Sequence, residues 1–133
     1  MFRSARAVLI GALSIPFFGL MCGHFILPHF SQFTPTGTLA ASGFVLSVLC
    51  AEICNVAGGY IGAQLAPQKP MLHAFIVGST AVVMATYVAV FLWAREPLWY
   101  HFATVLLSLP TTMAGGWLAV KHLWKPTLPQ HEF

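Results

Sequence analysis

The sequence has very little charge. Of its 133 residues only 7% are charged, six Lys and Arg and three Asp and Glu, whereas charged residues make up about 25% of soluble domains. A soluble domain of this size must cover most of its surface with polar groups, and nine charged side chains cannot do so. This scarcity excludes a soluble enzyme and a disordered chain. It also excludes a nucleic-acid binder, because so few basic residues cannot form a basic face.

The sequence contains long apolar stretches with few or no charged residues. Hydrophobic residues make up 58% of the chain, and the mean hydropathy is +0.79. A helix needs about 20 apolar residues to cross the hydrocarbon core of a bilayer. Four stretches reach that length: 7–27, 38–66, 71–93 and 98–120. None shows the strict alternation of barrel strands. The sequence therefore predicts an all-α integral membrane protein, with residues 1–133 forming a single domain of four transmembrane helices.

The basic residues are distributed unevenly between the two sides of this predicted bundle. With four spans, both termini and the connection between the second and third spans lie on one side. Only Arg95, next to Glu96, falls on the other side. The basic residues of the first side are Arg3, Arg6, Lys69, Lys121 and Lys125. Because positively charged segments stay in the cytoplasm, both termini are predicted to be cytoplasmic in a multi-pass protein of the inner membrane.

One acidic residue lies inside a predicted span. Glu52 falls near the middle of the second span, where a charge costs about 3 kcal/mol or more, so it is a candidate functional residue. Asn55 lies one turn further along the same helical face. The fourth span brings Ser108, Thr111 and Thr112 to a similar depth. Three roles stay open for Glu52: a protonated group that joins two helices, a contact with a partner or ligand, and part of a proton or ion path.

Small residues recur every four positions along the predicted helices. Such rows let helix backbones approach closely, so they predict tight packing. The other helix could belong to the same chain, to a second copy or to another subunit. The predicted packing residues are Gly19, Gly23, Cys54, Gly58, Gly59, Gly62, Ala63, Gly115 and Gly116.

Two short segments of the chain resemble each other. Residues 57–61 read Ala-Gly-Gly-Tyr-Ile, and residues 114–118 read Ala-Gly-Gly-Trp-Leu. Both lie toward the same end of an even-numbered span. This likeness leaves open that the second helical hairpin is a diverged copy of the first.

Two histidines are candidates for cofactor binding. His24 and His101 fall at similar depth, near the non-cytoplasmic ends of the first and fourth spans. Facing histidines can ligate a haem iron, and one histidine can bind the magnesium of a chlorophyll. The alternative is that both are ordinary histidines of the membrane interface, and no cofactor is expected on that interpretation. No metal centre is predicted, whereas bound lipid is expected.

A longer stretch resembles a known kind of protein. Residues 55–66, Asn-Val-Ala-Gly-Gly-Tyr-Ile-Gly-Ala-Gln-Leu-Ala, are followed by His73 and Ala74 at the start of the next span. This pattern resembles small four-span bacterial inner-membrane proteins of unknown function, over about 25 residues. The resemblance implies a bacterial inner membrane and implies no activity.

Two functions are consistent with these features. The short connections leave no room for a catalytic site outside the membrane, so an enzyme is not expected. The first function is that of an accessory subunit packed against a larger membrane complex of respiratory or photosynthetic type. The second is that of a small homo-oligomeric transporter or channel that uses Glu52 as a proton or cation site.

Overall fold

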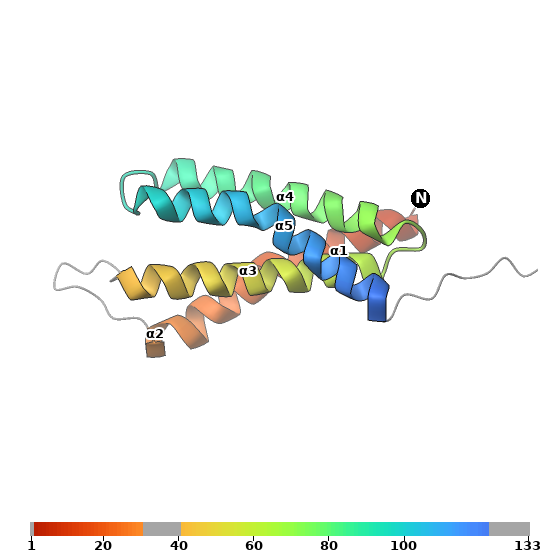
Figure 1. The fold of residues 1–133 in the computed structure, drawn as a ribbon, viewed down its shortest axis with the longest axis horizontal. Helices are drawn as coiled ribbons and strands as arrows, with labels where there is room; N and C mark the ends of the chain where they lie inside the picture. Colours follow the sequence, from red (N-terminus) through yellow and green to blue (C-terminus); the bar gives the residue numbers. More distant parts are fainter. Residues whose placement is uncertain (1, 31–40, 123–133) are drawn as a thin grey trace, which may run out of the picture.

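Four long helical segments account for most of residues 2–30 and 41–122, the part of the chain that the computed structural model describes (Figure 1). No strand occurs in these two ranges. The first segment consists of α1, a π-helical turn and the short α2. The elements are α1 (Phe2–Met21), the π-helical turn Cys22–Ile26, α2 (Leu27–Phe30), α3 (Ala41–Gln64), α4 (Pro70–Phe91) and α5 (Leu98–His122).

The prediction of four helices that can cross a membrane is confirmed. Each segment is long and apolar enough to do so, which indicates a multi-pass membrane protein. The ends differ from the prediction by a few residues, and most at the first helix, which begins at Phe2 rather than at residue 7. Residues 38–40 of the second predicted span lie outside the described ranges. Helix α4, which is the third predicted span, begins at Pro70. The missing N–H of this proline costs no hydrogen bond in the first turn of a helix.

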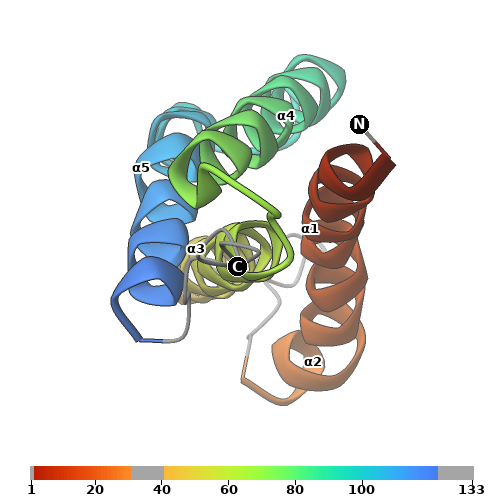
Figure 2. The same cartoon turned by 90° about the vertical axis from the view of Figure 1, so that its right-hand side faces the viewer.

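The helices surround α3. Figure 2 shows α3 at the centre, with α1 on one side and α5 on the other, and α4 lies against all three. Helices α3 and α5 run parallel (Figure 1). We call the end of the bundle that holds Phe2, the turn at residues 65–69 and His122 the basic end, because Arg3, Arg6, Lys69 and Lys121 gather there. The opposite end holds the α4–α5 turn at residues 92–97.

Helices α3 and α5 make the closest contact of the bundle, through two glycines. A Cβ atom added to Gly59 would overlap the backbone carbonyl of Thr112, and one added to Gly115 would overlap the backbone carbonyl of Val56. The contact is therefore reciprocal and involves backbone on both sides. Of the other predicted packing residues on this side, Gly116 contacts Ala74 of α4, and Ala63 is fully buried in the core formed with Ala74 and Ala119.

Helix α1 crosses α3 at a second group of glycines. A Cβ added to Gly11 would lie 2.9 Å from Gly62 Cα and 3.0 Å from Gly58 O, and Val77 of α4 also packs there. Gly11 is a packing residue that the sequence analysis missed. Gly19 and Gly23, which it named instead, have open space where a Cβ would be. Beyond its crossing with α3, α1 diverges from the rest of the bundle (Figure 1).

We predict that Gly59→Ala lowers the free energy of unfolding by about 1–3 kcal/mol, because the added methyl group meets backbone that cannot rotate away. Gly23→Ala is the matched control, since its methyl group enters open space and alanine favours the helix. Denaturant titration of the purified protein in detergent measures both. Equal stability of the two variants would contradict the close α3–α5 contact.

Candidate functional site

The Glu52 carboxyl group joins α3 to α5. Glu52 is 9% exposed, and its Oε2 accepts hydrogen bonds from Thr111 Oγ1 at 2.6 Å and from Asn55 Nδ2 at 3.1 Å. Asn55 Nδ2 also donates to Ser108 Oγ of α5 at 3.3 Å. The structure thus brings together Glu52, Asn55, Ser108 and Thr111, all of which the sequence singled out.

Thr112, the remaining predicted polar residue, takes no part in this network. It is completely buried, and its hydroxyl donates to the backbone carbonyl of Ser108 at 2.6 Å. Its side chain packs against Gly59 and Gly78 instead of facing Glu52. Thr111 and Thr112 are adjacent in sequence and therefore point about 100° apart around the helix, so only one of them can face Glu52.

The second oxygen of Glu52 has no partner. Both donors converge on Oε2, while Oε1 is buried and accepts no hydrogen bond from the described part of the chain. A buried polar atom without a partner costs about 1–3 kcal/mol, and such atoms are rare enough to require an explanation. The carboxyl group is thus only half satisfied. It joins two helices through Oε2 and keeps Oε1 available for a proton or another group.

A separate polar cluster lies at the opposite end of the bundle. His101 is 3% exposed, stacks on Trp93 with ring centroids 5.5 Å apart, and places Nδ1 3.6 Å from Glu96 Oε2. Burial raises the pKa of Glu96, and the nearby His101 acts in the opposite direction. Beside this cluster the hydroxyl groups of Ser47 and Tyr100 lie 3.1 Å apart and link α3 to α5.

The two histidines considered for a cofactor are not brought together. His24 is exposed on the π-helical turn and packs against Phe25, whereas His101 is enclosed by Trp93 and Glu96. Both views place α3 between the diverging end of the first segment and α5 (Figures 1 and 2). Within residues 2–30 and 41–122 there is no group of three or more His, Cys, Asp or Glu side chains that could hold a metal ion.

The residues that carry the family resemblance have structural roles. Lys69 adopts a left-handed conformation with φ of 49° just before α4, and the ring Nδ1 of His73 lies 3.1 Å from the carbonyl oxygen of Lys69. Ala74 is fully buried against Gly116 of α5. The His-Ala pair therefore anchors the start of α4 to its own turn and to α5.

We predict that Glu52→Gln changes the free energy of unfolding by less than about 1 kcal/mol, because one amide oxygen can still accept from Thr111 and Asn55. Glu52→Leu removes that acceptor and leaves a buried amide hydrogen unpaired, which lowers the free energy by about 1–3 kcal/mol. Denaturant titration in detergent distinguishes them. A leucine variant as stable as the glutamine variant would show that the network contributes nothing to the fold.

Comparison of the chain with protein-family models, curated proteins and solved structures finds no match. The function is therefore inferred from the arrangement of this chain's own residues.

Proposed function

We propose that the chain is a small accessory subunit of a larger membrane complex, and that the diverging half of its first helix receives a transmembrane helix of that complex. The observation that carries the proposal is the isolation of this helix. Only 6% of the residues in its most apolar stretch are buried, compared with 39% in the second span. A span with so little support from its own bundle is suited to a contact with another protein.

An apolar groove marks where that contact would form. It has a volume of about 300 Å³ and lies between the diverging end of the first segment and α3, and we call it the α1–α3 groove. Its walls include Cys22, Phe25, Ile26, Ile53, Cys54 and Ala57. Small residues next to bulky apolar ones suit the close packing of a membrane helix, which depends on van der Waals contact.

The rest of the chain supports a packing role. Helices α3 and α5 are in backbone contact at Gly59 and Gly115. Such close packing suits a rigid subunit better than a protein that alternates between two open states. The described connections 65–69 and 92–97 are short turns. We further propose that the basic end faces the cytoplasm of a bacterial inner membrane, since the only basic residue of the described α4–α5 turn is Arg95.

The expected result is that the gently solubilised protein migrates on a native gel with a much larger assembly. Phe25→Ala removes a bulky side chain from the wall of the α1–α3 groove, and because Phe25 is 59% exposed within the chain, we expect this variant to abolish comigration. Val83→Ala is the control, because Val83 is 69% exposed on α4, away from the groove. Migration of the unaltered protein only as a monomer or small homo-oligomer would overturn the proposal.

A second function is favoured by one observation, the buried Oε1 of Glu52, which accepts no hydrogen bond from residues 2–30 and 41–122. An intramembrane carboxyl group with a free oxygen can take up and release a proton. On this alternative the chain is a small homo-oligomeric transporter or channel, and Glu52 is its proton or cation site.

We predict for this alternative that Glu52→Gln abolishes proton-coupled flux in liposomes, because the amide keeps the hydrogen bonds and cannot ionise. Thr112→Val is the control, since Thr112 bonds only its own helix. Flux that the Glu52→Gln variant retains in full would remove Glu52 from any transport mechanism.

A further inference from the structure

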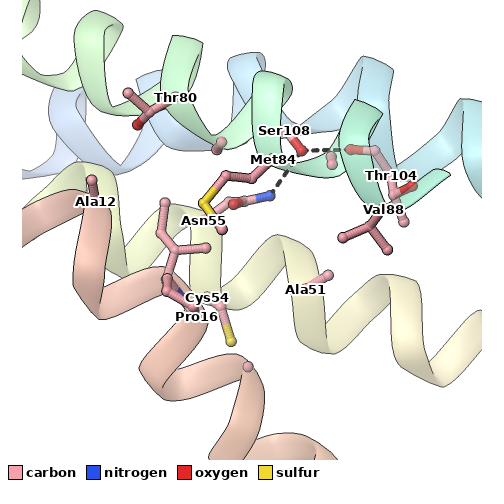
Figure 3. Close-up of a pocket in the computed structure, with 14 residues that line it drawn as sticks. Ala12, Pro16, Ala51, Cys54, Asn55, Thr80, Met84, Val88, Thr104 and Ser108 are labelled. Carbon is pink, nitrogen blue, oxygen red and sulfur yellow. Dashed lines mark hydrogen bonds between the residues drawn. The ribbon is translucent and has the colours of Figure 1, made fainter. Parts of the chain in front are cut away.

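A pocket of about 230 Å³ lies where the four long helices diverge, and we call it the α1–α4 pocket (Figure 3). It is larger than an engineered protein cavity of about 150 Å³ that binds benzene. Met84 and Val88 of α4 line the pocket and are 54% and 47% exposed. The pocket therefore opens at the surface of the bundle beside these two residues. It occupies the side of α3 that carries Asn55, whereas the α1–α3 groove occupies the side that carries Ile53.

The polar side chains of the pocket have already donated their hydrogens. Asn55 Nδ2 donates to Glu52 Oε2 and to Ser108 Oγ, and Ser108 donates to the carbonyl of Thr104. The hydroxyl of Thr104 donates to backbone carbonyls of its own helix. Thr80 likewise donates to a carbonyl of α4, at 2.7 Å. No amide or hydroxyl hydrogen of these lining side chains is left for a ligand.

Hydrogen-bond acceptors remain at the same place. Asn55 Oδ1 receives no hydrogen bond from any residue that the structure describes, and Figure 3 shows the Asn55 nitrogen turned toward Ser108 and its oxygen turned away. On α1, Pro16 has no N–H, so the carbonyl of Ala12 lacks its usual helical donor. Both Ala12 and Pro16 line the pocket. The pocket can thus accept hydrogen bonds, while the amide and hydroxyl hydrogens of its side chains are already engaged.

The chemistry of the ligand follows from this asymmetry. Most of the lining is aliphatic, so the body of the ligand must be apolar. The open acceptors require an O–H or N–H donor, and an unmade hydrogen bond is costly in a medium without water. A charged ammonium group is disfavoured, because no charged side chain lines the pocket. A neutral hydroxyl group meets all three conditions.

We propose that the α1–α4 pocket binds a lipophilic alcohol or phenol, whose hydroxyl group donates a hydrogen bond to Asn55 Oδ1 and whose apolar body lies against α1 and α4. This site is distinct from the proposed subunit contact, because it is lined by residues of α4 and α5 that the α1–α3 groove lacks, although Cys54 of α3 borders both. Its occupant is a small molecule from the bilayer and not a helix of a partner.

The test uses the full chain in lipid nanodiscs and two photoactivatable probes, an octanol that carries a diazirine and the methyl ether of the same molecule. The two differ in one hydrogen-bond donor. We expect the alcohol to label residues of the pocket such as Met84 roughly threefold to tenfold more than the ether, the difference that one hydrogen bond makes. Peptide mass spectrometry locates the label, and an excess of unlabelled octanol should remove it.

Two variants check the place of binding. Ala85→Phe fills the pocket from α4 and should abolish the labelling, whereas Val83→Phe adds the same group on the exposed side of α4 and should leave it unchanged. Phe25→Ala should also leave it unchanged, because Phe25 lines the α1–α3 groove and not this pocket, which separates this site from the subunit contact. Equal labelling by the alcohol and the ether would overturn the proposal, and so would label confined to exposed residues outside the pocket.

Discussion

The backbone contact between α3 and α5 is the constraint on which the other features depend. At Gly59 and Gly115 neither helix carries a Cβ, so the backbone of one helix lies directly against a carbonyl of the other. Helices this close can exchange short side-chain hydrogen bonds such as that from Thr111 to Glu52 at 2.6 Å. In a bilayer, where apolar burial does not drive helices together, close packing and these hydrogen bonds supply the stability.

The crossing of α1 over α3 has a different consequence. The glycines that let α1 approach, Gly11 on one side and Gly58 and Gly62 on the other, all lie toward the basic end. With the helices pinned there, a crossing angle separates them progressively toward the opposite end (Figure 1). One divergence therefore produces two spaces, the α1–α3 groove and the α1–α4 pocket. Both are consequences of where α1 crosses α3.

The sequence predicts the four helices because the length and hydropathy of an apolar run depend on the chain alone. It also predicts that Glu52 lies near Asn55 and Thr111, because counting residues from the ends of each predicted span places them at the same depth. It could not separate Thr111 from Thr112, since that choice depends on how α5 is rotated against α3. Nor could spacing tell Gly11 from Gly19 as the crossing point of α1, because both are small and the crossing angle decides.

Asn55 connects the pocket to the carboxyl group. Its two amide hydrogens go to Glu52 and Ser108, and its oxygen is the acceptor that remains for a ligand. A hydroxyl group bound to that oxygen would polarise the amide and strengthen its hydrogen bond to Glu52, because linked hydrogen bonds reinforce one another. By thermodynamic reciprocity, binding of a proton to Glu52 and binding of the hydroxyl group in the pocket would then alter each other's affinity by the same factor. On the proposed binding, a single amide would make the Glu52 network responsive to what the membrane supplies.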